Sequence, residues 1–194
     1  GDPRWSVTTV DGGLEWNVSD TAMNALGELD MTKTVTGLTI YAHSGKKVTI
    51  DTNGKTLDDM TFTHRLKLGG SGDFDDAGQP KGRVLSIDVM GNTNITVAAM
   101  SSSSGSDRVL NISAGTKDNV IAEIPALGAE LSKGEVFYKG GPTKLYFYSP
   151  SSGVNVYYIK AASVPTGIRE INVVRPSVNV YPNPTDVRVF VDVN

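Results

Sequence analysis

Short runs in which apolar and polar residues alternate recur along the chain, and clusters of Gly, Ser, Thr, Asn and Asp separate them. Within 84–90, Leu85, Ile87 and Val89 share one side of an extended backbone. A period of two is typical of strands that are buried on one face only. The pattern predicts strands at 35–41, 47–51, 62–68, 84–90, 94–100, 108–113, 120–124, 134–138, 144–149 and 154–161.

Strands that are buried on one face indicate two antiparallel sheets packed together, because parallel α/β strands read as continuous apolar runs. We therefore predict an all-β fold over residues 1–162, an antiparallel β-sandwich of the jelly-roll (galactose-binding-like) type. Helix is scarce. Residues 19–27 predict one short helical turn that Gly27 ends, and 125–131 predict another.

The composition narrows the functional classes. The 194 residues are enough for one large domain, or one domain and a fragment, and none is cysteine, which excludes disulfides, thiol catalysis and cysteine metal sites. The 18 Lys and Arg against 21 Asp and Glu give a net charge of −3, so the sequence predicts no nucleic-acid partner. No apolar run approaches the roughly 20 residues of a membrane helix, so we expect no membrane span.

After residue 162 the composition becomes linker-like, and residues 163–194 read as a linker followed by the start of a second β module. The stretch "VYPNPTDVRVFVDV" resembles the opening of the C-terminal sorting module of type IX secretion. The resemblance implies an exported protein at the cell surface, extracellular or on the outer membrane. Gly1 before Asp2 looks like a cleavage remnant, so we expect any leader to have been removed. The matching residues are Tyr181, Pro182, Asn183, Pro184, Val187, Val189 and Val191.

A longer resemblance covers residues 60–161. "FTHRLKLGGSGDFDD", "GRVLSIDVMGNTNITVAAMSSSSGSDRVLNI" and "GGPTKLYFYSPSSGVNVYYIKA" resemble a β-sandwich appended to secreted pectate lyases and pectin esterases. The resemblance implies a non-catalytic carbohydrate-binding module of a polysaccharide-degrading system, with a polysaccharide or oligosaccharide as its ligand, for example an acidic plant glycan such as pectin. The chain has no counterpart of the β-helical catalytic domain of those enzymes, so no catalytic residue is carried over.

Basic side chains offer one candidate ligand site. Arg65 and Lys67 lie on the polar side of 62–68, and Arg83 and Arg108 lie at strand ends. If these residues cluster, their cations would bind uronate carboxylates, which guanidinium groups match with two hydrogen bonds. The alternative is that they are ordinary solvent-facing residues paired with nearby aspartates.

Tyrosines offer a second set of ligand contacts, because sugar rings stack on aromatic faces. Tyr146 and Tyr148 share one face of their strand. Tyr157 and Tyr158 are adjacent and should point to opposite faces, so one of them is predicted to lie in the core, and Tyr157 joins the candidate binding residues. The alternative is that these tyrosines span the core and its rim and keep only the hydroxyl in water.

An acidic, Gly-rich loop is a candidate metal site. Asp73, Asp75 and Asp76 could supply oxygen ligands to a structural calcium, although a solvated turn explains the same residues. We expect no other cofactor. The leading hypothesis is thus a non-catalytic carbohydrate-binding module. The alternatives are a structural or adhesive module with a protein partner at the cell surface, and an enzyme, for which the sequence shows no recognisable pair of carboxylates.

Overall fold

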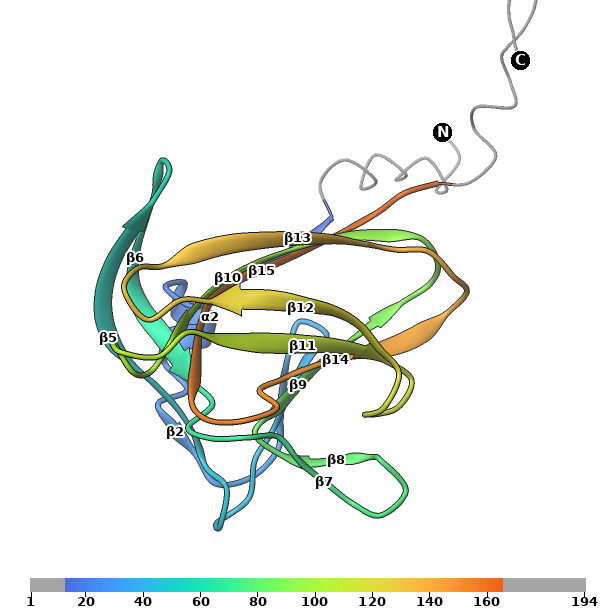
Figure 1. Ribbon diagram of the computed structural model, residues 1–194, viewed down its shortest axis with the longest axis horizontal. Coiled ribbons are helices and arrows are strands. Elements are labelled where there is room, and N and C mark those ends of the chain that lie inside the picture. The colour runs from blue at the N-terminus through green and yellow to red at the C-terminus, as the bar shows by residue number, and fades with distance from the viewer. Residues whose placement is uncertain (1–12, 166–194) are drawn as a thin grey trace, which may run out of the picture. The chain divides into compact units, whose positions relative to one another are not determined.

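Two antiparallel sheets account for most of residues 13–165, the part of the chain that the computed structural model describes (Figure 1). Sheet A has the order β13-β10-β15-β6-β5-β2, with β1 also paired to β15, and sheet B has the order β12-β11-β14-β9-β4-β3. The strands of sheet A are β1 (Leu14–Asn17), β2 (Glu28–Leu29), β5 (Val48–Leu57), β6 (Met60–Lys67), β10 (Thr93–Ser101), β13 (Ser132–Tyr138) and β15 (Val154–Ser163). Those of sheet B are β3 (Lys33–Val35), β4 (Leu38–Tyr41), β9 (Val84–Val89), β11 (Arg108–Ala114), β12 (Val120–Ala126) and β14 (Thr143–Tyr148).

The predicted antiparallel β-sandwich of jelly-roll type is confirmed, and its core lies where the alternation placed it. Leu85, Ile87 and Val89 of β9 face Ile95 and Val97 of β10 within one hydrophobic cluster between the sheets. Nine of the ten predicted strands correspond to single strands. The C-terminal module predicted around 181–191 lies outside the described residues.

The strand predicted at 35–41 is instead the end of a tight hairpin between β3 and β4. Thr36 and Gly37 both have positive φ, 49° and 86°, which is the backbone of a type I′ turn. Helix α2 (Thr21–Asn24) confirms the first helical turn, and Gly27 follows it at φ 61°. The second predicted turn is wrong, because Pro125 and Ala126 complete β12. Within the described range no helix is long and apolar enough to cross a membrane.

A β-bulge in β15 corrects the prediction for its adjacent tyrosines. Ala98 of β10 pairs with Tyr158, but Ala99 pairs with Val156, so Tyr157 is the extra residue of the bulged strand. The extra residue resets the alternation. Tyr157 and Tyr158 therefore belong to the same small cluster on the outer face of sheet A, and neither lies between the sheets.

This second cluster, the hairpin cluster, packs the distal half of the β5–β6 hairpin on the outer face of β10 and β15. Phe62 is fully buried, with its ring centroid 5.8 Å from that of Tyr157 and 6.4 Å from that of Tyr158. At the hairpin tip, Asp58 Oδ2 lies 3.0 Å from Lys133 Nζ on β13. The hairpin thus covers the outer face of sheet A at this level. The buried members of the cluster are Phe62, Ala98, Leu131, Tyr157 and Tyr158.

A third, two-stranded sheet covers part of the outer face of sheet B. It consists of β7 (Asp73–Phe74) and β8 (Pro80–Gly82), and we call residues 73–82 the strap. In Figure 1 the strap lies on the side of sheet B away from sheet A. Its Phe74 packs against Val84, Tyr146 and Tyr148, which form a third small cluster. Both outer faces of the sandwich are therefore partly covered by hairpins.

Candidate functional site

An open groove lies on the outer face of sheet A beyond the hairpin cluster. Antiparallel pairing sets Asn94 opposite Phe137 in one row, and Thr96 between Glu135 and Lys160 in the next. Residues in one row point to the same face, so these five side chains converge. The groove has a volume of about 470 Å³. We call it the Phe137 groove, and its side-chain lining is Asn94, Thr96, Glu135, Phe137, Lys160 and Ala162.

Phe137 provides an apolar surface among these polar groups. Its exposed fraction is 47%, which is unusual for a ring on a sheet whose other large apolar side chains are mostly buried. β13 is an edge strand of sheet A, so only β10 flanks the ring within the sheet. Glu135 accepts hydrogen bonds, Asn94 donates and accepts them, and Lys160 donates them. The groove thus combines one aromatic face with hydrogen-bonding groups of both kinds.

On the side of the groove next to β1, three polar side chains contact one another. Tyr158 donates its hydroxyl to Glu15 Oε2 at 2.8 Å, and Lys160 Nζ lies 3.9 Å from the same oxygen. Burial raises the pKa of Tyr158 strongly, and the hydrogen bond and charge of Glu15 raise it further. Tyr158 therefore stays protonated and acts as a fixed donor. Glu15 therefore contacts both Tyr158 and Lys160, and its carboxylate holds the Lys160 ammonium beside the groove.

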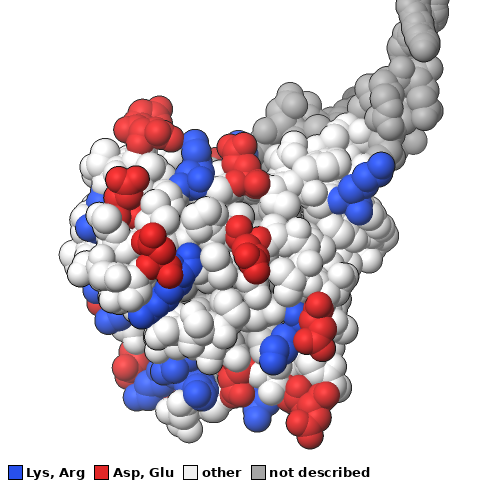
Figure 2. Space-filling view, viewed as in Figure 1, with Lys and Arg blue, Asp and Glu red and all other residues white. Residues whose placement is uncertain are grey.

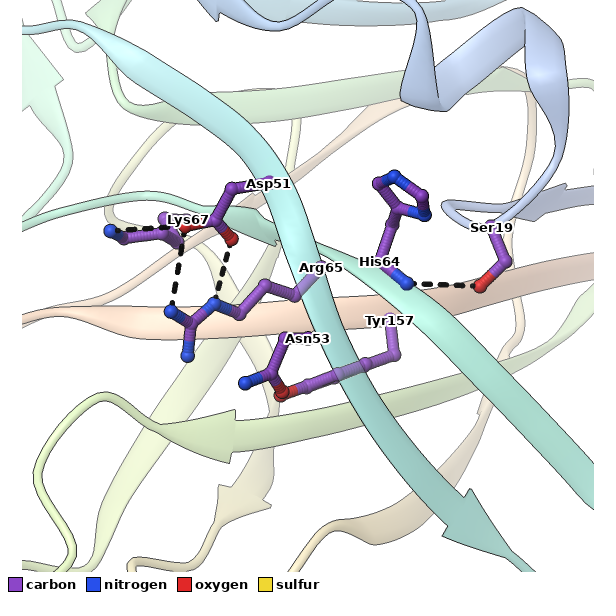
Figure 3. Close-up of polar contacts among 7 residues, drawn as sticks. All are labelled: Ser19, Asp51, Asn53, His64, Arg65, Lys67 and Tyr157. Carbon is purple, nitrogen blue, oxygen red and sulfur yellow. Dashed lines mark hydrogen bonds and ion pairs between the residues drawn. The ribbon is translucent and has the colours of Figure 1, made fainter.

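A second polar group of residues lies on the proximal half of the β5–β6 hairpin and on the adjoining β15 (Figure 3). Arg65 donates from Nε to Asp51 Oδ1 at 2.9 Å, and Lys67 Nζ lies 3.5 Å from Asp51 Oδ2. Tyr157 donates its hydroxyl to Asn53 Oδ1 at 2.6 Å. We call these five residues the Arg65 cluster. The structure thus brings together three predicted ligand residues, Arg65, Lys67 and Tyr157.

The cations of the Arg65 cluster are already neutralised in part. Burial would raise the pKa of Asp51, but the hydrogen bond and charge of Arg65, with those of Lys67, outweigh burial and lower it. The hydrogen bond to Asp51 raises the pKa of Arg65. Burial raises the pKa of Tyr157 despite the opposing effect of Arg65. Two cations share one carboxylate, so the cluster keeps one net positive charge.

Arg83 and Arg108 do not join this cluster but hold loops. Arg83 donates from Nε to the Lys47 carbonyl at 3.3 Å, and its guanidinium lies against the backbone of Gly70. Arg108 donates from Nη1 to the Gly153 carbonyl at 2.6 Å. The single cationic patch predicted from four residues is therefore wrong. Figure 2 likewise shows Lys and Arg interspersed with Asp and Glu on the face in view.

The remaining predicted residues lie at or beneath the strap. Tyr146 and Tyr148 are 3% and 4% exposed, so they form no open stacking surface. Asp73 Oδ2 bonds to His43 Nε2 at 2.8 Å, and this hydrogen bond is the main cause of the lowered pKa of Asp73. Asp75 Oδ1 accepts two backbone N–H groups of its own turn. Neither these aspartates with Asp76 nor any other acidic or His residues in 13–165 converge as a metal site.

Sequence reasoning missed the Phe137 groove. In "GEVFY", Glu135 and Phe137 alternate with Val136 and Tyr138, so both faces of the strand carry an apolar residue. The period of two groups these residues into pairs but does not tell which pair faces the core. The pairing of Phe137 with Asn94, a polar residue on the outward side of β10, would have settled it. This information lies in the pairing of two strands and not in the local sequence of either strand.

No protein-family model matches the sequence, and no similar sequence was found among curated proteins. The fold resembles solved β-sandwich domains at low similarity. The CBM22-1 xylan-binding domain from Paenibacillus barcinonensis Xyn10C aligns over 78% of this chain and 95% of its own, with 13% identity and a TM-score of 0.47. The CBM36-1 domain of a multidomain xylanase from the hindgut metagenome of Trinervitermes trinervoides aligns over 61% and 99%, with 11% identity and a TM-score of 0.40. A family 35 carbohydrate binding module from Clostridium thermocellum aligns over 66% and 98%, with 13% identity and a TM-score of 0.37.

Proposed function

We propose that this protein is a non-catalytic carbohydrate-binding module that holds its ligand in the Phe137 groove. The observation that carries the proposal is the exposed Phe137 ring set among Asn94, Thr96, Glu135 and Lys160 in one open groove. The C–H face of a sugar ring stacks on an aromatic face, and its hydroxyl groups both donate and accept hydrogen bonds. Pockets with an apolar surface and a few placed polar groups are typical of small-ligand sites.

The charges of the groove favour a neutral glycan. Lys160 is matched by Glu135 at the groove and by Glu15 beside it, so the site offers no surplus of positive charge to an acidic polymer. The acidic glycan expected from the basic residues would have to use the Arg65 cluster, where Asp51 already binds both cations. We therefore place neutral plant glycans first and pectin second. Export to the cell surface, implied by residues 181–191, is part of the same proposal.

The test is a calorimetric titration of the full chain with xylohexaose, cellohexaose and hexagalacturonate at low and high salt. We expect salt-insensitive binding of a neutral oligosaccharide. Phe137 exposes 47% of its surface, so a stacked sugar covers at most roughly 90 Å² of this residue, worth up to about 2 kcal/mol. Phe137→Ala should then weaken binding by up to about 30-fold. Val120→Ala, which trims another exposed apolar side chain on sheet B, should leave the affinity unchanged.

Three results would count against this assignment. Equal affinities for the Phe137→Ala variant and the wild type would remove the groove as the site. Salt-sensitive binding of hexagalacturonate alone, lost on Arg65→Ala, would move the site to the Arg65 cluster and the ligand to acidic glycans. Binding of none of the three oligosaccharides would favour the structural or adhesive alternative.

A further inference from the structure

Two neighbouring polar side chains on β11 are buried without a hydrogen-bond partner. Asn111 is 7% exposed and Ser113 is fully buried, and neither Asn111 Oδ1 nor Ser113 Oγ has a partner among the described residues. Buried polar atoms are nearly always paired with protein or with a bound molecule, and leaving one unpaired costs about 1–3 kcal/mol. Residues two apart on a strand share a face, so both atoms point to the same region.

That region is the outer face of sheet B, where aromatic and polar side chains lie side by side. The register sets Tyr148 opposite Asn111, and Tyr146 between Ser113 and Ser86. Charged side chains border these five residues: Glu123 pairs with Asn111, and Lys144 and Asp88 form the row next to Tyr146 and Ser86. The five residues themselves, with two aromatic rings, an amide and two hydroxyls, form a floor with the chemistry that recognises a sugar ring and its hydroxyl groups.

The strap covers this floor with one aromatic side chain. The Phe74 ring centroid lies 4.8 Å from that of Tyr148 and 6.3 Å from that of Tyr146, both in edge-to-face geometry. A stacked sugar would occupy the side of the two tyrosines that Phe74 now takes. The floor is therefore closed by a contact that a ligand could replace.

Lys117 Nζ lies 5.8 Å from the centroid of the Phe74 ring, and few other contacts hold the strap across sheet B. At one end Asp73 bonds to His43, and near the tip Gly78 accepts the backbone N–H of Lys117 at 3.3 Å. Tyr146 donates to the side chain of Gln79 at 3.3 Å. The two strands of the strap bond to each other and form a sheet separate from sheets A and B. Between residues 72 and 83, the strap is thus a hairpin that side chains and one backbone bond near its tip attach to the sandwich.

Glycines flank the strap at both ends. Gly69, Gly70 and Gly72 precede it, and Gly82 closes it. Arg83, the next residue, has φ 59°, which is rare for a residue with a side chain. Gly72 donates its backbone N–H to the Ser149 carbonyl at 2.9 Å, and Arg83 donates its own to the Tyr41 carbonyl at 2.7 Å, so these two bonds fix the points about which the strap would turn.

We propose that the strap is a lid over a second carbohydrate subsite, with Tyr146 and Tyr148 as its stacking surface and Asn111 and Ser113 as its hydroxyl contacts. The proposal rests on the carbohydrate-binding function proposed above but uses the opposite sheet. In the closed state the Phe74 ring occupies the site. For a ligand that binds only the open state, the apparent Kd equals the intrinsic Kd divided by the fraction of molecules that are open. Loosening the strap should therefore raise the affinity of this subsite.

The test uses the Phe137→Ala background, in which binding by the groove on sheet A is weakened as predicted above. Xylohexaose and cellohexaose are titrated into Phe137→Ala and into Phe137→Ala/Phe74→Ala, and amide shifts of Ser113 and Tyr146 are followed by NMR. We expect at least tenfold tighter binding by the double variant, with shifts at both amides. Adding Asn111→Leu or Ser113→Ala should abolish the gain. His43→Ala, which removes the hydrogen bond to Asp73 and the one that His43 Nδ1 accepts from the Gly45 N–H, serves as the opening variant if Phe74→Ala does not fold.

The outcomes separate the two proposals. Unchanged affinity in both opening variants, or a gain that survives Asn111→Leu and Ser113→Ala, would overturn the lid and leave water as the partner of the two buried atoms. The Phe137→Ala result alone would then decide whether the groove on sheet A is a binding site. Conversely, the wild type could bind none of the oligosaccharides while the opening variants bind them, and Asn111→Leu or Ser113→Ala could abolish that binding. This result would support the lid and would reject the groove as a binding site.

Discussion

Phe62 should carry most of the attachment of the distal half of the β5–β6 hairpin to the sandwich. Its side chain is fully buried in the hairpin cluster, between the hairpin and β15. A phenylalanine buries roughly 150–250 Å², worth about 4–6 kcal/mol as an upper limit, and Phe→Ala changes in cores cost about 3–5 kcal/mol. We expect Phe62→Ala to lower the free energy of unfolding by about 3–5 kcal/mol. Phe62→Leu keeps much of the volume and should cost about 1 kcal/mol.

Urea unfolding gives these free energies, and amide hydrogen exchange along 57–62 reports whether the hairpin opens first. Lys133→Ala is the matched control, because it removes the exposed ion pair at the hairpin tip without touching the cluster. It should leave the stability unchanged within error, as exposed pairs contribute little. A loss below about 1 kcal/mol in Phe62→Ala, or an equal loss in Lys133→Ala, would refute the view that the cluster anchors the hairpin.

Three smaller effects can be measured by the same assay. The pKa of Asp51 is lowered in the folded state, because the hydrogen bonds and charges of Arg65 and Lys67 outweigh burial. The stability that Asp51 contributes is therefore present above about pH 4 and is lost on acidification. Asp51→Asn should flatten the fall in the free energy of unfolding between about pH 5 and pH 3. Burial and Glu15 raise the pKa of Tyr158, so its contribution is present below about pH 10 and lost above it, and Tyr158→Phe should remove that alkaline loss. Tyr148→Phe leaves a carbonyl of the β11–β12 loop unbonded and should cost about 1–2 kcal/mol at any pH between those ranges.

Local alternation predicted the sandwich well, because it reports which side chains share a face. The β9 and β10 core residues follow it directly. It failed at Tyr157 and Tyr158, where the bulge inserts one residue and resets the period. It also failed at Thr36 and Gly37, where two positive φ angles make a turn inside an apparent strand. Both failures come from single-residue backbone features that hydrophobic periodicity does not record.

The candidate site was harder to predict than the fold because both sheets are covered on their outer faces by segments distant in the sequence. Tyr146 and Tyr148 do share a face, as expected, but the strap buries that face. Arg65 and Lys67 do point outward, but Asp51, from the neighbouring strand, binds them both. Which outward residues remain free is decided by tertiary contacts, and a single sequence does not show these.

The position of the Phe137 groove follows from where the hairpin stops. Along β13 the outward residues are Lys133, Glu135 and Phe137, each in a successive row of sheet A. The hairpin tip reaches the first of these rows, where Asp58 meets Lys133. The next two rows extend beyond the hairpin cluster and form the groove. The hairpin contacts follow this one row, which Tyr158, Ala98 and Lys133 form across β15, β10 and β13. The path of the hairpin across the strands therefore determines which rows of this face stay open to a ligand.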